Sequence, residues 1–503
     1  MGTSTTLNPR ALPSGSGTTG SSPAAAGTGT AGGSSAPATA LDWHACTGSL
    51  AGQLPGLQCA TLAVPVSYGD PAGPAIDLAL DRVKATGSKI GSLLVNPGGP
   101  GESGLQFLPG VYGDLDAGLR SHFDIVSFDP RGVGESAPII CGTGAQLDAW
   151  GNVDAAPTTP AGVSALIAVD QQFAQGCQSR SGNLLADVGT TDAARDMDRI
   201  RAAVGDAKLN YFGFSYGTFL GATYADLFPT HIRAMVVDGA EDPSLDAIAA
   251  DDTQSVALEG ELDQFFAWCA AGHGCSWHPP GGAGGMQADV LNLLNMSRAH
   301  PFSASGTSRT VGPNQVLYGI VDTLYTTSTW PDLGDALAAA DGGDGTRLLA
   351  LYDDYVQRDT NGQYQNVDEA SSAVTCDDTP RPTEAAVLAA GPQAAAAAPV
   401  VGLANLYSLL QCVVWPTTPT DAPHKIVAPG APPIVVVGST RDPATPYAWA
   451  QSLASQLSSG VLLTRVGDGH TGYLFSSCVR QAVGTYFDSL TPPAAGTVCQ
   501  TDR

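Results

Sequence analysis

A serine flanked by glycines, between a short apolar segment and a helical segment, limits the possible folds of this chain more than any other feature. Residues 213–217 read Gly-Phe-Ser-Tyr-Gly and match the pattern G-x-S-x-G. Residues 209–212 predict a buried strand, and residues 218–225 predict a helix with small side chains on one face. A strand that turns sharply into a helix lifts the serine hydroxyl above the strand end, an arrangement called a nucleophile elbow. An ordinary Gly-rich turn is the alternative, because the chain contains 61 glycines.

Apolar strands alternate with helical segments on both sides of this turn. A helix is predicted over residues 190–204, with Thr191 as its cap. This alternation predicts a mostly parallel sheet covered by helices, and together with the elbow it predicts an α/β-hydrolase fold. The predicted strands are residues 59–68, 75–83, 92–96, 123–128, 209–212, 232–237, 433–437 and 461–464.

The length of 503 residues allows several domains, or one large core with an inserted lid. Residues 1–40 contain almost no large apolar side chain and predict a disordered tether. The hydrolase core is predicted over residues 41–241 and 428–503, and the mainly helical stretch 242–427 is interpreted as a cap over the strand ends. The apolar stretch 394–410 is broken by Pro399, so it predicts a buried helix and no membrane span.

Acidic residues outnumber basic ones by 47 to 22, which gives a net charge of −25. This charge argues against nucleic acid and anionic membrane surfaces as partners. The sequence contains no phosphate-binding loop, metal-ligand cluster or cofactor motif that stands out, and no cofactor is expected.

Ten cysteines are spread along the chain, and none forms a C-x-x-C pair. An even number of this kind predicts disulfides and an oxidising compartment, hence a secreted or cell-surface protein; reduced cysteines in a cytosolic protein are the alternative. No apolar core of a signal peptide is visible, so we expect either that the export signal has been removed or that the true start lies upstream. The sequence does not fix the connectivity, but pairing of neighbours would give Cys46–Cys59, Cys141–Cys177, Cys269–Cys275, Cys376–Cys412 and Cys478–Cys499.

A catalytic serine needs a base beside it, and the chain offers one on a later loop. Asp442 and His470 each follow a predicted strand, in the order Ser215, Asp442, His470 that α/β-hydrolases use. His470 would accept the Ser215 proton and return it to the leaving group, while Asp442 would orient the imidazole and stabilise its cation. Asp468 is the alternative acid, but it lies only two residues from His470.

Two backbone N–H groups are expected to form an oxyanion hole beside the serine. One should belong to Tyr216, the residue after the serine. The other should come from residues 97–101, which read Pro-Gly-Gly-Pro-Gly. Pro100 has no N–H, so Gly99 is favoured, with Gly98 next. A Gly/Pro turn without a special role is the alternative for this loop.

Several blocks of the sequence are similar to those of a known family. The blocks are Asn-Pro-Gly-Gly-Pro-Gly at 96–101, Phe-Asp-Pro-Arg-Gly-Val-Gly at 128–134, the elbow at 213–218, Val-Asp-Gly at 237–239 and Asp-Pro-Ala-Thr-Pro at 442–446. They resemble the secreted tripeptidyl aminopeptidases of actinobacteria, which are relatives of the prolyl aminopeptidases, and the resemblance runs from about residue 45 to 500. It implies a serine exopeptidase that releases short peptides, often tripeptides, from free N-termini through an acyl-enzyme.

An enzyme of this kind has to bind the protonated amine of its substrate, which carboxylates do best. Cys376-Asp377-Asp378 resembles an acidic cap motif of the family, so Asp377 or Asp378 is predicted to bind the amine. Glu241 follows a predicted strand and could face the same site, and Glu102 replaces the small residue that is usual in the family's loop. A solvated acidic loop is the alternative interpretation of the acidic motif.

Two other functions use the same residues. An esterase or small-molecule amidase would have the same triad, so the expected substrate is a peptide or a small amide or ester. A non-catalytic binding protein on a hydrolase scaffold is the third hypothesis, although such proteins typically lose a member of the triad. We expect the enzyme to be a monomer.

Overall fold

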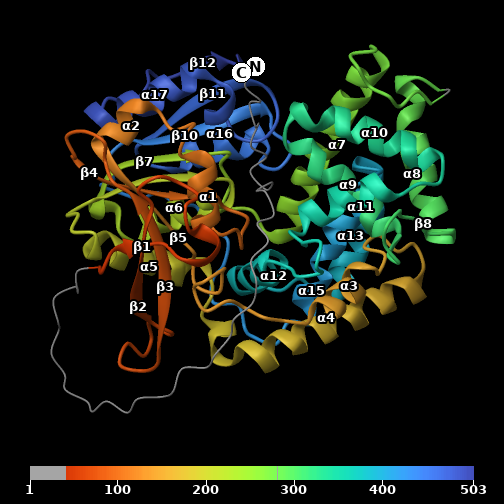
Figure 1. Cartoon of the computed structure of the whole chain (residues 1–503), viewed down its shortest axis with the longest axis horizontal. Coiled ribbons are helices and arrows are strands. Elements are labelled where there is room, and N and C mark those ends of the chain that lie inside the picture. The colour runs from red at the N-terminus through yellow and green to blue at the C-terminus, as the bar shows by residue number, and fades with distance from the viewer. Residues whose placement is uncertain (1–40, 280, 503) are drawn as a thin grey trace.

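A computed structural model describes residues 41–279 and 281–502 of the chain. The predicted tether, residues 1–40, lies outside the described residues. A sheet with its covering helices forms one side of the molecule, and a mainly helical part forms the other (Figure 1).

One large sheet organises the first of these parts, and it confirms the predicted α/β-hydrolase fold. Its order is β1-β2-β3-β5-β4-β6-β7-β10-β11-β12; the first strands pair antiparallel up to β5, and all later pairs are parallel. Every residue of β4, β5 and β6 is buried, as expected for parallel strands covered on both faces. The strands are β1 His44–Ala45, β2 Gln58–Pro65, β3 Ala75–Val83, β4 Gly91–Asn96, β5 Phe123–Phe128, β6 Leu209–Phe214, β7 Ile232–Asp238, β10 Ile434–Arg441, β11 Gly460–Asp468 and β12 Val498–Gln500.

Helices cover both faces of the sheet because side chains alternate along each strand. Phe212 and Phe214 of β6 pack on one face with α1 (Gly104–Val111), α2 (Ala117–His122) and α17 (Ser477–Ser489). Tyr211, the residue before Phe212, packs on the other face with α5 (Thr190–Ala203), α6 (Tyr216–Leu227) and α16 (Tyr447–Gln456). Each large apolar side chain buried in these layers stabilises the fold by about 1.5–3 kcal/mol.

The second part of the molecule is a cap, most of which is inserted between β7 and β10. It has its own apolar core, separate from the layers around the sheet. No described helix is long and apolar enough to cross a membrane. The inserted elements are α7 Ala247–Ala270, α8 Ala283–Ala299, β8 Phe302–Ser303, β9 Thr310–Val311, α9 Pro313–Asp322, α10 Trp330–Asp341, α11 Thr346–Tyr355, α12 Val367–Asp378, α13 Glu384–Ala397, α14 Gly402–Ser408 and α15 Leu410–Val413.

Two earlier helices also pack against the cap, although the predicted boundary at residue 242 left them in the core. They are α3 (Gly144–Gly151) and α4 (Pro160–Ser181), which lie beside α15 in Figure 1. Leu166 of α4 belongs to one apolar cluster with Val387 and Leu406 of the cap. The cap is therefore assembled from two stretches of the chain.

The predicted helix over residues 394–410 is wrong as a single element. Helix α13 ends at Ala397, and α14 begins only at Gly402. Pro399 lies in the break, where its missing N–H and fixed backbone angle prevent one helix from continuing.

All ten cysteines form disulfides, and the pairing of neighbours is confirmed. The pairs Cys141–Cys177 and Cys376–Cys412 lie close to the helices that form the cap. Disulfides of this kind form and persist in oxidising environments.

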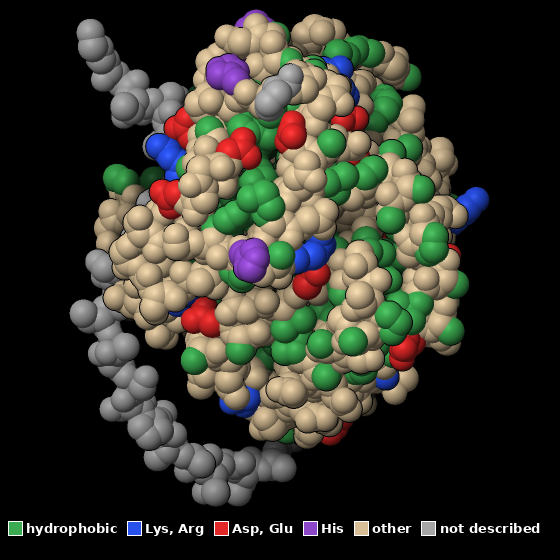
Figure 2. Space-filling view, turned by 90° about the vertical axis from the view of Figure 1, so that its right-hand side faces the viewer, with side chains coloured by type: hydrophobic (Ala, Val, Ile, Leu, Met, Phe, Trp, Pro, Cys, Tyr) green, Lys and Arg blue, Asp and Glu red, His purple; other side chains and the backbone are tan. Residues whose placement is uncertain are grey.

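The face of the molecule shown in Figure 2 carries few charged side chains. On this face (Figure 2), acidic and basic side chains are dispersed singly among apolar and uncharged ones.

Candidate active site

Ser215 stands on a sharp turn between β6 and α6, as the elbow pattern predicts. Its backbone has φ 54° and ψ −130°, a strained conformation for a residue other than glycine. The turn is held by the Ser215 N–H, which donates to Asp238 O at 2.9 Å. A Cβ atom on Gly213 would lie 2.3 Å from Gly217 O, and one on Gly217 would lie 2.8 Å from Asn96 Oδ1. Both flanking glycines are therefore required by close packing.

Asp442 and His470 meet on the loops that follow β10 and β11. His470 Nδ1 lies 2.7 Å from Asp442 Oδ1, and both side chains are buried. The same carboxylate accepts the N–H groups of Ala444, Thr445 and Thr471 at 2.9–3.0 Å. Burial raises the pKa of Asp442, but the nearby His470 and these hydrogen bonds outweigh it and hold the pKa below its usual value.

The other ring nitrogen of His470 is available for Ser215. His470 Nε2 is buried, and it has no hydrogen-bond partner among the described residues. Ser215 and His470 both line one cavity. Asp468, the alternative acid, is instead paired with Arg441 through both of its carboxylate oxygens. The geometry therefore favours Asp442 as the partner of His470.

The Gly/Pro loop after β4 lies directly against the elbow. A Cβ atom on Gly98 would be 2.9 Å from Tyr216 N and 3.0 Å from Ser215 Cβ. The Gly98 N–H donates to Asn96 Oδ1 at 3.0 Å, so it is already used. Gly99 and Tyr216 line the cavity beside Ser215, which favours their N–H groups as the pair that faces a developing oxyanion.

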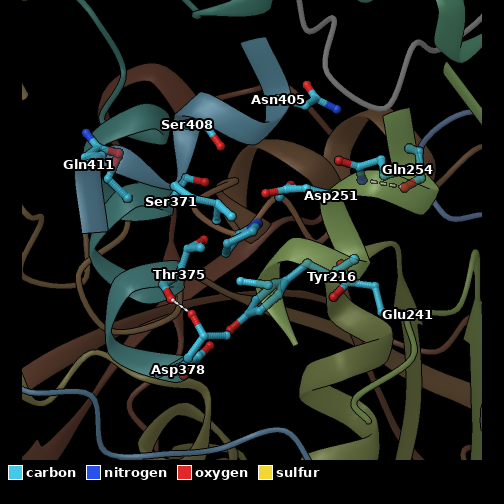
Figure 3. A pocket seen from close by; sticks show the side chains of 18 of the residues that line it. Tyr216, Glu241, Asp251, Gln254, Ser371, Thr375, Asp378, Asn405, Ser408 and Gln411 are labelled. Carbon is cyan, nitrogen blue, oxygen red and sulfur yellow. Dashed lines mark hydrogen bonds between the residues drawn. The ribbon is translucent and has the colours of Figure 1, made fainter. Parts of the chain in front are cut away.

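The cavity has a volume of about 490 Å³ and lies between the strand ends and the cap. Aromatic side chains form much of its wall, and polar side chains from α7, α12, α14 and α15 point into it (Figure 3). Among the described residues, no lysine or arginine lines it. The acidic residues that line it are Glu102, Asp170, Glu241, Asp242, Asp251, Asp368, Asp378 and Asp421.

The structure places the residues predicted to bind substrate in different surroundings. Glu241 and Glu102 line the cavity near Ser215. Burial, with a smaller contribution from Asp378, raises the pKa of Glu241 to about 7. Asp378 also lines the cavity, whereas Asp377 is fully buried and does not line it.

Both aspartates cap helix α5, in place of the predicted Thr191. Asp377 Oδ2 accepts the Gly189 N–H at 3.1 Å. Asp378 accepts the Thr190 N–H with one oxygen and the Thr190 hydroxyl with the other, both at 2.6 Å. Carboxylates stabilise helix N-termini, where N–H groups have no partner within the helix. One oxygen of Asp377 is therefore bound by the backbone, while its Oδ1 is buried without a hydrogen-bond partner among the described residues; both oxygens of Asp378 already have donors.

Five of the eight acidic residues that line the cavity were not predicted from the sequence, and Asp251 is the one whose surroundings point to a role. Asp251 points from α7 into the cavity, across from Ser371 of α12 (Figure 3). Its Oδ2 is buried and has no hydrogen-bond partner among the described residues. Burial, and then repulsion from Asp252, raise the pKa of Asp251 well above its usual value. No signal in the sequence separates this residue from a solvated helical aspartate.

A second carboxyl group of α7 lies buried near the triad, outside the cavity. Glu261 is 2% exposed, and neither carboxylate oxygen has a hydrogen-bond partner among the described residues. Burial, and then repulsion from Asp468 and Asp442, raise the pKa of Glu261 to about 9. The folded chain therefore keeps a proton at neutral pH that an exposed glutamate loses at about pH 4.3.

We expect the melting temperature to fall as the pH rises from about 4 to about 9, because the folded state holds the Glu261 proton over this range and the unfolded state does not. Glu261→Gln should make this fall shallower by several degrees. Melting curves across this range test the prediction, with the exposed residue changed in Glu384→Gln as control. Equal slopes for Glu261→Gln and wild type would contradict it.

Comparison with known proteins gives this site a family. A family model described as an alpha/beta hydrolase fold matches residues 91–277, and one described as TAP-like protein matches residues 398–499. Serine protease Hip1 of Mycobacterium tuberculosis is 39% identical over 475 residues, which cover 91% of each chain. Carboxylesterase B of the same species is 37% identical over 90% of this chain and 89% of its own. Tripeptidyl aminopeptidase of Streptomyces lividans is 34% identical over 89% of this chain and 84% of its own.

These similarities extend over nearly the whole chain, and they confirm the family resemblance that the sequence blocks indicate. The fold and the presence of a serine hydrolase site agree with them. The chain belongs to the TAP-like family of α/β-hydrolases and is a serine hydrolase.

Proposed function

We propose that this enzyme is an exopeptidase that releases short peptides, namely tripeptides, from free N-termini through an acyl-enzyme. Ser215 attacks the scissile carbonyl while His470 Nε2 accepts its proton. The Gly99 and Tyr216 N–H groups stabilise the oxyanion, and His470 returns the proton to the leaving amine. Water then hydrolyses the acyl-enzyme by the same steps.

The acidity of the cavity is the observation that carries this proposal. Eight carboxyl groups and no lysine or arginine, among the described residues, line the space next to Ser215. A peptide whose amine is free brings a positive charge that such a cavity attracts, whereas a carboxylate or an acetylated amine gains nothing there.

Glu241 and Asp251 are the residues that we propose to bind the amine. Both line the cavity, and burial raises the pKa of each. An ammonium group beside them would favour their ionised forms. Asp377, the earlier candidate, does not line the cavity, and one of its oxygens caps the start of α5.

We also infer that the enzyme works outside the cytoplasm and as a monomer, with residues 242–427 as the main part of its cap. The five disulfides support the first inference. The inference of a monomer is supported by the fact that one chain supplies the proposed triad, the proposed oxyanion donors and the cavity.

The test compares Ala-Ala-Pro-X with a free and with an acetylated N-terminus, where X is a chromogenic amine. We expect kcat/KM to be roughly 10- to 100-fold lower for the acetylated peptide, because a hydrogen bond to a charged group contributes about 1.5–3 kcal/mol. Ser215→Ala serves as the blank. Equal cleavage of both peptides would exclude the amine site but retain the serine hydrolase.

An esterase is the second candidate, because a relative that is 37% identical is named carboxylesterase B. This function predicts hydrolysis of simple acyl esters, with Ala-Ala-Pro-X left intact in both forms. The same Ser215→Ala variant would abolish the ester activity.

A further inference from the structure

A chain of hydrogen bonds links Tyr216, whose N–H is assigned to the oxyanion hole, to the cap. The Tyr216 hydroxyl contacts Thr190 Oγ1 at the start of α5. Thr190 Oγ1 in turn donates to Asp378 Oδ2 at 2.6 Å, at the end of α12. All three side chains are buried, with exposed fractions of 6% for Tyr216, 1% for Thr190 and 7% for Asp378. Figure 3 shows Tyr216 extending toward Asp378.

The opposite end of α12 packs against the other half of the oxyanion hole. Gly101, in the loop that contains Gly99, lies so close to this helix that an added Cβ atom would be 2.5 Å from Val367 O and 2.9 Å from Ser371 N. The first half of helix α12 is therefore in contact with the loop that contains Gly99, and the last residue of the helix is linked to Tyr216.

We propose that Thr190 and Asp378 are positioning residues for catalysis: they hold the Tyr216 side chain, and α12 thereby fixes both donors of the oxyanion hole from the cap. The proposal rests on the serine hydrolase chemistry of the site and does not depend on which acyl group is transferred.

The physical reason is that an oxyanion hole tolerates little displacement of its hydrogen-bond donors. Tyr216 is the first residue of α6, so a rotation of its backbone also turns the N–H that faces the oxyanion. Donors of this kind act because they are aligned before the charge develops. Misplacement by about 1 Å can cost about 100-fold in rate. The Thr190 hydroxyl is buried, and Asp378 accepts two hydrogen bonds from Thr190. The Tyr216 side chain that contacts this hydroxyl therefore has little freedom to move.

Thr190→Val tests the proposal, because it removes the hydroxyl and keeps the shape of the side chain. We expect kcat to fall about tenfold while KM changes less than about twofold, since only the alignment of the transition state is lost. Thr190→Ser keeps the hydroxyl and should recover most of kcat. Thr191→Val is the matched control, because Thr191 lies on the same helix turn as Thr190 but its hydroxyl donates to Asp421, outside α5, and not to Tyr216.

The assay uses both 4-nitrophenyl acetate and the free Ala-Ala-Pro-X peptide. The loss in Thr190→Val should appear on every substrate that wild type cleaves, because every acyl transfer uses the oxyanion hole. Failure of the peptidase proposal would show as no cleavage of the peptide by wild type, and the ester would still report on Thr190.

Tyr216→Phe provides a second variant, independent of whether Thr190→Val folds. It should lower kcat by a similar factor, and the double variant should be no slower than either single one, because both remove the same link. Additive losses, a kcat unchanged in Thr190→Val, or an equal loss in Thr190→Ser would overturn the proposal. So would a rise in KM alone, which would make Asp378 a substrate-binding residue.

Discussion

Asp442→Asn is expected to lower kcat about 10⁴-fold with little change in KM, by analogy with the loss measured when the acid of another Ser-His-Asp triad is changed to an amide. The carboxylate uses both oxygens: Oδ1 faces His470 Nδ1 and the N–H groups of Ala444 and Thr445, and Oδ2 accepts the Thr471 N–H. All of these partners are donors when His470 carries its proton on Nδ1.

An asparagine has only one oxygen to offer these donors. If its NH2 group faces Thr471, two donors oppose each other in a buried site, which is costly. If it faces His470, the imidazole has to accept with Nδ1 and carry its proton on Nε2. In that tautomer, His470 cannot accept the Ser215 proton.

Asp468→Asn is the matched control for this prediction. Asp468 lies two residues from His470, but it is paired with Arg441. Its replacement should change kcat less than about threefold, since an exposed ion pair contributes at most about 1 kcal/mol and here acts only on a loop. Steady-state kcat values of the two variants and wild type on one substrate test this prediction. A larger loss in Asp468→Asn than in Asp442→Asn would assign the acid of the triad to Asp468.

The residues that sequence alone located share one property: their chemistry depends on local order along the chain. The elbow needs a strand, a glycine-flanked serine and a helix in direct succession, and all three are visible in residues 209–225. Asp442 and His470 each follow a run of buried strand residues, and parallel strands end at the same edge of a sheet.

The acidic residues behave differently, because their roles depend on which element packs against them. Asp377 and Asp378 follow a cysteine in a short motif, but only the fold brings them to the first N–H groups of α5, nearly 190 residues earlier in the chain. Asp251 faces the cavity because of the rotation of α7 about its axis. The helical pattern of the sequence does not fix this rotation, since α7 has no clear apolar face.

Gly98→Ala is expected to lower kcat by about 10² to 10³, the cost of losing one donor from an oxyanion hole. Gly98 has φ 105°, a backbone conformation that side chains disfavour. The added Cβ atom would lie 2.5 Å from Phe214 O and 2.9 Å from Tyr216 N. These contacts are with backbone on both sides of Ser215, so the loop or the elbow has to move, and the distance between the two proposed donors changes.

Gly113→Ala is the control for Gly98→Ala, because a Cβ atom there meets no atom within 4 Å and Gly113 has no positive φ. It should keep the activity and the melting temperature of wild type. Rates and melting curves of both variants separate a local effect from unfolding, since a folded Gly98→Ala with a low kcat has lost alignment only. Full activity in Gly98→Ala would mean that the loop and the elbow separate without cost. The assignment of the oxyanion hole to Gly99 and Tyr216 would then be wrong, and with it the role proposed for α12.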